Sequence, residues 1–224
     1  MYDLVIVGGG AAGFFAAIRF KEQCPERSAL ILERGPKVLR KVSISGGGRC
    51  NVTHDCQDLD DLLACYPRGG PRLRALLGQY MPADTVGWFA ERGVTLKTEA
   101  DGRMFPCSDR SQTIVECLTS AATRAGVEWR TGVSVQGLGG ELDSFQLICK
   151  AETILARRVL LATGGGSKAT DWLRERGHKP VEDIPSLFTF CCRDPVLNEL
   201  AGVSVERVQA RLHLGAEFES TGPS

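Results

Sequence analysis

Glycine is concentrated in three places along the chain. The 224 residues include 26 Gly, whereas the usual share of ~7% predicts about 16. The surplus of about ten lies in three clusters: Gly8–Gly10 with Gly13, Gly46–Gly48, and Gly164–Gly166. Because glycine has no Cβ, such clusters let backbone N–H groups come close to a ligand. We therefore expect three sites of close backbone approach around one ligand.

The first cluster, Gly8–Gly13, matches the pattern GxGxxG. An apolar, β-branched run, Tyr2–Val7, precedes it, and Ala11–Gln23 follows with apolar residues at helical spacing. A second apolar run, Ser28–Glu33, completes a βαβ unit and ends on an acid, Glu33. Strand, helix and acid in this order predict that the unit binds a dinucleotide, and a turn without a ligand is the weaker alternative.

Each position of this unit has its own task. Gly8 allows the tight turn, Gly10 leaves room for a pyrophosphate, and Gly13 lets the helix pack closely on the strand. The helix start at Ala11–Ala12 offers free N–H groups and a partial positive charge to the phosphates. The Glu33 carboxylate can accept hydrogen bonds from the ribose hydroxyls.

The third cluster favours FAD over NAD as the dinucleotide. Leu160–Gly166 ends an apolar strand with the Ala-Thr-Gly turn that two-motif flavoproteins place beside the cofactor. The same glycines with Ala169 could form a second fingerprint for NAD, but no strand and acid follow at the right distance. The sequence therefore predicts FAD, with Thr163, Gly164 and Gly165 beside it, and no NAD(P)-binding domain is apparent.

The second cluster lies within Ser45–Asn51, a segment that lacks the lysine of a phosphate-binding loop. The consecutive glycines Gly46, Gly47 and Gly48 can still bring backbone N–H groups against an anionic or planar ligand. Arg40, Lys41 and Arg49 add positive charge near the expected diphosphate. A flexible surface loop is the alternative that the spacing leaves open.

Catalytic candidates are few. Cys50 follows Arg49, where a thiolate could be stabilised, and Cys56 could join it in a redox dithiol. Five residues separate these cysteines instead of the four found in flavin disulfide reductases, so packing thiols are the default interpretation. His54 could act as acid or base near a flavin, although no carboxylate partner is visible. In a flavoprotein this scarcity is expected, because the cofactor carries the hydride chemistry.

The elements that must position these residues form a mixed α/β pattern. Residues 34–56 show no clear period and predict a functional loop. Ser108 or Asp109 is expected to cap a helix that ends at Gly126. The other expected elements are helices over 57–65, 72–80 and 83–92, a hairpin of 94–98 with 103–105, a strand over 127–130, an antiparallel meander over 133–157 and a buried strand over 158–163.

Composition excludes several classes of protein. The 27 basic and 27 acidic residues balance and form no long run of like charge, which argues against nucleic-acid and electrostatic membrane partners. The chain shows neither a signal peptide nor an apolar stretch long enough for a membrane span. The 9 cysteines are scattered without a CxxC pair, which predicts reduced cytoplasmic thiols and no metal site.

Four segments together resemble the BaiN-like (YhiN-like) flavoprotein family. They are Gly8–Gly13, Lys41–Thr53 with its SGGGRCN string, Gly102–Pro106, and Ala162–Gly165. The resemblance spans essentially the whole chain. It implies a two-domain, FAD-dependent oxidoreductase that uses NAD(P)H or a small organic substrate, with a Rossmann-like parallel sheet and an antiparallel meander.

The resemblance also implies positions for the cofactor. Gly8–Gly13, Glu33 and Arg34 would hold the ADP half of FAD, and the backbone of Val135 would contact adenine. Lys41 and Ser45–Asn51 would line the diphosphate and the flavin. Family members are nearly twice as long, so residues 1–190 would form an FAD-binding domain that lacks its C-terminal return. Residues 191–224 would begin an inserted β-rich domain, and a non-catalytic FAD-binding fragment therefore remains an alternative.

Overall fold

The structure analysed is a computed structural model that describes residues 1–165, 169–181 and 199. Met1–Glu182 forms one compact unit. The predicted β-rich domain over 191–224 lies, apart from Glu199, outside the described residues, as does Gly166. Within the described part, no helix is long and apolar enough to cross a membrane. No group of His, Cys, Asp and Glu in that part gathers where it could hold a metal ion.

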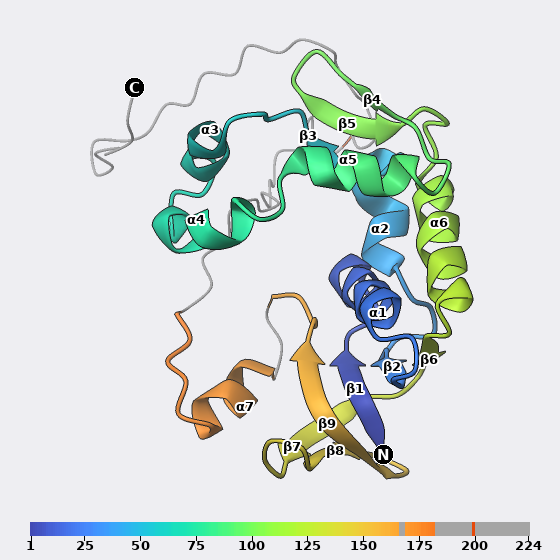
Figure 1. Cartoon of the computed structure of the whole chain (residues 1–224), viewed down its shortest axis with the longest axis vertical. Helices are drawn as coiled ribbons and strands as arrows, with labels where there is room; N and C mark the ends of the chain where they lie inside the picture. Colours follow the sequence, from blue (N-terminus) through green and yellow to red (C-terminus); the bar gives the residue numbers. More distant parts are fainter. Residues whose placement is uncertain (166–168, 182–198, 200–224) are drawn as a thin grey trace. The chain divides into compact units, whose positions relative to one another are not determined.

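A six-stranded sheet forms the centre of this unit, in the order β6-β2-β1-β9-β8-β7 (Figure 1). The first four strands in this order run parallel, and β8 and β7 continue the sheet antiparallel beyond β9. The strands are β1 (Tyr2–Val7), β2 (Ala29–Leu32), β6 (Glu128–Arg130), β7 (Val135–Gly139), β8 (Phe145–Cys149) and β9 (Thr153–Leu161). The predicted parallel sheet with an antiparallel meander is thereby confirmed.

Alternating side chains of the central strands build two cores. On one face, Ile6 and Ile31 pack with α1 (Ala11–Gln23) and α6 (Ser111–Arg124). On the other face, the residues adjacent to Ile6 and Ile31 in β1 and β2 belong to a second core, which includes Trp172 of α7 (Ala169–Glu175). This period of two is what a strand buried on both faces requires.

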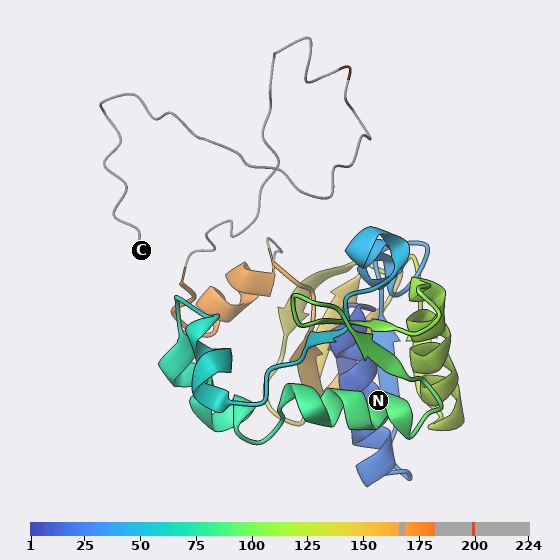
Figure 2. The same ribbon diagram turned by 90° about the horizontal axis from the view of Figure 1, so that it is seen from above.

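A small second sheet with the order β3-β5-β4 lies beside the helices of the first core (Figure 2). Its antiparallel strands are β3 (Thr53–His54), β4 (Leu96–Thr98) and β5 (Arg103–Pro106). Three helices connect β3 to β4: α3 (Leu59–Ala64), α4 (Gly70–Leu77) and α5 (Pro82–Ala90). The predicted hairpin and these three helices are confirmed, with ends shifted by a few residues.

Three sequence expectations need correction. The aperiodic segment 34–56 contains a short helix α2 (Arg40–Ile44) and a 3₁₀ turn η1 (Ser45–Gly48), which are too short to produce a readable period. The last meander strand and the strand expected over 158–163 are one continuous strand, β9. Neither Ser108 nor Asp109 is the N-cap of α6, because Arg110 occupies that position and the Asp109 carboxylate binds Lys97 instead.

Gly13 illustrates how closely backbones approach in the first βαβ unit. A Cβ built at Gly13 would lie well under 3.0 Å from the carbonyl oxygen of Gly8, a separation that real Cβ atoms essentially never show. The atom in the way belongs to the backbone, so it cannot move aside as a flexible side chain could. Only glycine therefore lets α1 begin this close to β1.

We predict that Gly13→Ala destabilises the fold by about 1–3 kcal/mol, because a methyl group must be forced against backbone. Gly87→Ala in α5 is the matched control, since a Cβ at Gly87 meets nothing within 4 Å. That change should stabilise by about 0.5–1 kcal/mol through helix propensity alone. Urea unfolding of both variants measures the difference. Equal effects of the two substitutions would contradict the close packing.

Candidate cofactor site

The first and third glycine clusters lie against each other where β1 and β9 end. A Cβ at Gly8, whose φ is +119°, would lie under 3.0 Å from the Ala162 carbonyl oxygen. The Ala162 N–H donates to the Val7 carbonyl at 2.8 Å, which extends the pairing of the two strands. Ligands of open α/β sheets bind outside the carboxyl ends of the strands, so this contact marks the expected position of a cofactor.

The N-terminus of α1 opens at this position. Gly10 is the N-cap of α1, and no side chain caps the helix there. A Cβ built at Gly10 would meet nothing within 4 Å, in contrast to Gly8 and Gly13. Ala11 and Ala12 are exposed. Free space, uncapped N–H groups and the positive end of the helix dipole together fit a pyrophosphate.

Glu33 connects the end of β2 to the glycine turn. Its Oε2 accepts a hydrogen bond from the Gly9 N–H at 2.8 Å, and its Oε1 accepts one from the Gly35 N–H at 2.7 Å. Each carboxylate oxygen has a further lone pair, so the group can still accept bonds from ribose hydroxyls. Arg34 beside it is exposed.

The segment that leads to Val135 is held at the same place. Gly132 donates its N–H to the Gly35 carbonyl and Val133 donates its N–H to the Glu33 carbonyl, both at 2.9 Å. Val135 itself is the first residue of β7. Its backbone contact with adenine stays a prediction.

Ser45–Asn51, which we call the glycine loop, holds a strained backbone. Its φ angles are +56°, +66° and +86° at Gly46, Gly47 and Gly48, and +63° at Cys50. A Cβ at Gly47 or Gly48 would meet nothing within 4 Å, so there is space for a side chain at both positions. Their positive φ angles, however, are unfavourable for residues other than glycine. The loop therefore presents glycine backbone to open space, as close approach of a planar or anionic ligand requires.

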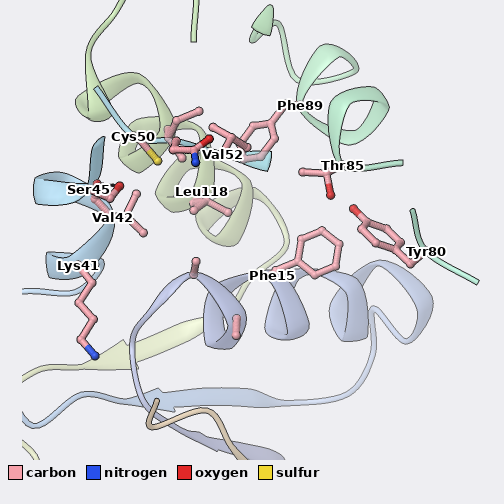
Figure 3. Close-up of a pocket in the computed structure, with 14 residues that line it drawn as sticks. Phe15, Lys41, Val42, Ser45, Cys50, Val52, Tyr80, Thr85, Phe89 and Leu118 are labelled. Atoms are coloured by element: carbon pink, nitrogen blue, oxygen red, sulfur yellow. Dashed lines mark hydrogen bonds between the residues drawn. The ribbon is translucent and has the colours of Figure 1, made fainter. Parts of the chain in front are cut away.

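A cavity of about 430 Å³ lies between α1, the glycine loop and the helices α5 and α6. Figure 3 shows Phe15, Tyr80 and Thr85 at one end of this cavity and Val42, Ser45 and Cys50 at the other. The lining residues are Ala11, Ala12, Phe15, Lys41, Val42, Ser45, Cys50, Asn51, Val52, Tyr80, Thr85, Phe89, Ile114 and Leu118. The structure thus brings the start of α1 together with four predicted residues from segment 41–51.

Lys41 links this cavity to the third glycine cluster. Its Nζ lies 3.5 Å from the position that a Cβ at Gly164 would take, and Gly164 has a φ of +73°. Thr163 and Gly165 flank Gly164 on the same turn. A cation beside the turn that follows β9 is well placed for an anionic group bound at the start of α1.

Phe15, Tyr80, Thr85 and Phe89 are lining residues that the sequence did not reveal. Phe15 lies three residues after Ala12, and residues at this spacing share one face of a helix. Helical spacing could therefore have placed Phe15 on the same face of α1 as Ala12. Tyr80, Thr85 and Phe89 carry no such signal, because only tertiary packing brings α5 to this cavity. They make the far end of the cavity aromatic and apolar.

Arg49 and His54 are not among the cavity's lining residues. The Arg49 guanidinium lies 2.5 Å from Glu99 Oε1 and stacks 4.1 Å from the centroid of the Phe105 ring. His54 is exposed, and its Nε2 lies 3.0 Å from the Asp101 carbonyl. These contacts hold both side chains away from the residues that line the cavity.

Cys50 lines the cavity as a buried thiol. Only 5% of its surface is exposed, and burial raises the pKa of its thiol above the ordinary value of 9.0. Cys56 is also a free thiol, and its Sγ donates to the Asp58 carbonyl at 3.3 Å. The Cys50–Cys56 redox pair stays a prediction, and Cys50 lacks the depressed pKa of a reactive thiolate.

We predict that iodoacetamide at pH 7.5 modifies the exposed Cys65 and Cys107 well before Cys50. Burial disfavours the thiolate, so alkylation of Cys50 should continue to rise as the pH passes above 9.0. Peptide mass spectrometry after timed quenching measures each site. Labelling of Cys50 ahead of the exposed thiols at neutral pH would show an activated cysteine instead.

Comparison with known proteins supports this reading of the fold. The sequence is 30% identical to 3-dehydro-bile acid delta(4,6)-reductase of Clostridium scindens, over 99% of this chain and 56% of the relative. It is 28% identical to a ribosomal RNA dihydrouridine synthase of Escherichia coli, over 92% of this chain and 53% of the relative. The chain therefore spans about half the length of the curated relatives it matches.

A solved structure extends the comparison to the fold. THI4 of Thermovibrio ammonificans matches with a TM-score of 0.53 and 18% identity, over 80% of this chain and 64% of that one. The family model described as "HI0933-like protein Rossmann domain" matches residues 2–183. The resemblance expected from the glycine clusters and the SGGGRCN string is confirmed: the chain belongs to the HI0933-like Rossmann domain family.

Proposed function

We propose that this chain binds FAD and forms the cofactor-binding part of an oxidoreductase that reduces a carbon–carbon double bond in a small organic substrate. The observation that carries this proposal is the convergence of three glycine-rich segments on the open N-terminus of α1. Gly8 and Gly13 are packed tightly, whereas Gly10, Gly47 and Gly48 face open space. That contrast fits a bound dinucleotide rather than a ligand-free turn.

In this proposal, different residues of the site bind different parts of FAD. The uncapped N–H groups at Ala11–Ala12 would bind the diphosphate, and Lys41 would balance its charge from beside the turn Thr163–Gly165. Glu33 would bind the adenosine ribose, and the backbone of Val135 would face adenine. Bound FAD would supply the hydride chemistry, for which the protein contributes position and electrostatics.

The glycine loop would meet the flavin side of the cofactor. Ser45, Cys50 and Asn51 line the same cavity as the start of α1. Between them in the sequence, Gly47 and Gly48 present backbone to open space. Apolar and aromatic side chains from α5 and α6 form the remaining wall, and a bound cofactor and substrate would displace water from this cavity. Removal of water is the environment that a hydride transfer needs.

The names of two relatives support the direction of the reaction. One is named a 3-dehydro-bile acid delta(4,6)-reductase and the other a ribosomal RNA dihydrouridine synthase, and both names describe a reduced product. We propose the same class of reduction for this family member, with NADH or NADPH as the electron donor. Residues 1–190 would be its FAD-binding domain, and the scattered free thiols favour a reducing, cytoplasmic setting.

We predict that Glu33→Gln weakens FAD binding by about tenfold or more, because the charged acceptor is lost where ribose hydroxyls bind. Glu128→Gln is the matched control. Glu128 is the first residue of β6, next to β2, and its carboxylate accepts a hydrogen bond from the Tyr2 hydroxyl. Quenching of FAD fluorescence during titration with each protein gives the dissociation constants. Similar constants for the two variants would remove Glu33 from the site.

We predict that the purified full chain is yellow and that NADH or NADPH bleaches its visible flavin absorbance under anaerobic conditions. A hydride from the nicotinamide would reduce bound flavin, and reduced flavin lacks the visible absorbance of the oxidised form. Stopped-flow spectroscopy with each nucleotide identifies the donor. A colourless protein would favour a chain that does not hold FAD. Bound flavin that never bleaches would exclude nicotinamide as the direct donor.

A further inference from the structure

We propose that Arg49 is a positioning residue that holds the glycine loop in the shape that meets the cofactor. Its guanidinium is fixed by carboxylates of the second sheet and by the ring of Phe105. Arg49 itself would not touch FAD. This inference rests on the proposed function, and it gives the SGGGRCN arginine a different task from the charge near the diphosphate that the sequence predicts.

The glycine loop needs support from outside itself. Gly46, Gly47, Gly48 and Cys50 all have positive φ, and such conformations cost free energy for Cys and entropy for Gly. Backbone hydrogen bonds within the loop close it on itself. The Arg49 N–H donates to the Gly46 carbonyl at 3.3 Å and also to the Ser45 carbonyl, and the Cys50 N–H donates to the Ser45 carbonyl at 2.9 Å. Without contacts to the rest of the fold, a turn of three consecutive glycines would have many alternative conformations.

The second sheet supplies carboxylates to Arg49 from two places. Glu99 follows β4 directly and lies 2.5 Å from Arg49 Nη1, and Asp109, three residues after β5, lies 3.7 Å from the same nitrogen. Lys97 binds the other oxygen of Asp109 and lowers the pKa of that carboxyl. The side chains of Arg49 and Glu99 are 35% and 29% exposed, so solvent screens this pair less than a fully exposed one.

Phe105 contacts the glycine loop at two points. Its ring is fully buried in β5, and the Arg49 guanidinium lies 4.1 Å from the ring centroid. A Cβ at Gly46 would lie 2.9 Å from the same ring, so the backbone of Gly46 packs directly on it. The ring thus holds the first glycine of the turn while the arginine that ends the turn lies over its face. A planar guanidinium suits this combination of stacking and ion pairing, and a lysine ammonium does not.

The test measures FAD binding by the full chain and by the variants Arg49→Gln, Arg49→Lys and Glu99→Gln. We expect each variant to raise the FAD dissociation constant by about tenfold or more, because the ion pair between Arg49 and Glu99 is lost or weakened. Lysine should rescue little, because it lacks the planar guanidinium that stacks on Phe105. The visible circular dichroism of bound flavin should change as well, because it reports how the protein holds the ring. A general loss of stability would not alter that signal at saturating FAD.

Arg103→Gln is the matched control. Arg103 is the first residue of β5, on the hairpin that carries Glu99 and Phe105. It binds Asp101 at 2.7 Å and approaches Glu99 at 3.6 Å. Its guanidinium lies 5.5 Å from the centroid of the Phe105 ring, farther than that of Arg49. Loss of its charge should leave the dissociation constant for FAD and the flavin signal unchanged. An equal effect at Arg103 would reduce the role of Arg49 to net charge and overturn the inference.

Glu99→Gln separates positioning from direct contact. If Arg49 bound the diphosphate itself, release from Glu99 would leave FAD binding unchanged or make it tighter. If Arg49 is a positioning residue, Glu99→Gln must weaken FAD binding. Unchanged or tighter FAD binding by this variant overturns the inference. Should Arg49→Gln fail to fold, Arg49→Lys and Glu99→Gln decide the matter. A wild-type chain that binds no FAD overturns the proposed function instead, which distinguishes the two failures.

Discussion

Close backbone packing of the turn at Gly8 against the ends of β1 and β9 is the constraint on which the arrangement of the site depends. Gly8 packs on the Ala162 carbonyl, and Gly13 packs on Gly8. These contacts bring the start of α1 directly above the carboxyl ends of two neighbouring parallel strands. Residues far apart in the sequence, from segments 8–13 and 162–165, therefore form one surface. Without glycine at these positions the helix would have to move away, and the surface would separate into two.

Glu33 and the segment that leads to the glycine loop both contact the turn at Gly9. Glu33 accepts a hydrogen bond from the Gly9 N–H, which holds the end of β2 beside the turn. Leu39 donates its N–H to the Gly9 carbonyl at 2.7 Å, so the segment that leads into α2 starts from the same turn. A single residue, Gly9, thus joins the acid to the chain that carries Lys41 and the glycine loop. The two segments proposed to bind different parts of a dinucleotide are therefore held by one turn.

The sequence predicted the parts of the fold that local patterns control. Buried β-branched runs and glycine spacing identified β1, α1 and β2, and the runs 94–98 and 103–105 identified the hairpin of the second sheet. Local patterns failed where tertiary contacts decide. Asp is a residue type that often caps helices, but the Asp109 carboxylate binds Lys97, and Arg110 is the residue at the N-cap position. For the same reason Phe15, Tyr80 and Phe89 could not be assigned to one cavity before the fold was known.

The predicted charges show a related limit. Lys41 and Arg49 are equally basic in the sequence, and both flank the same glycines. In the structure Lys41 lies beside Gly164, whereas Arg49 turns toward Glu99 and Phe105. The two cations therefore have different electrostatic effects: Lys41 leaves positive charge available at the site, and the charge of Arg49 is largely balanced by carboxylates. The difference follows from the hairpin at Leu96–Pro106, which brings Glu99 and Phe105 to Arg49. A strained glycine loop can thus keep an open face toward a ligand because its opposite face is held by an aromatic ring and an ion pair.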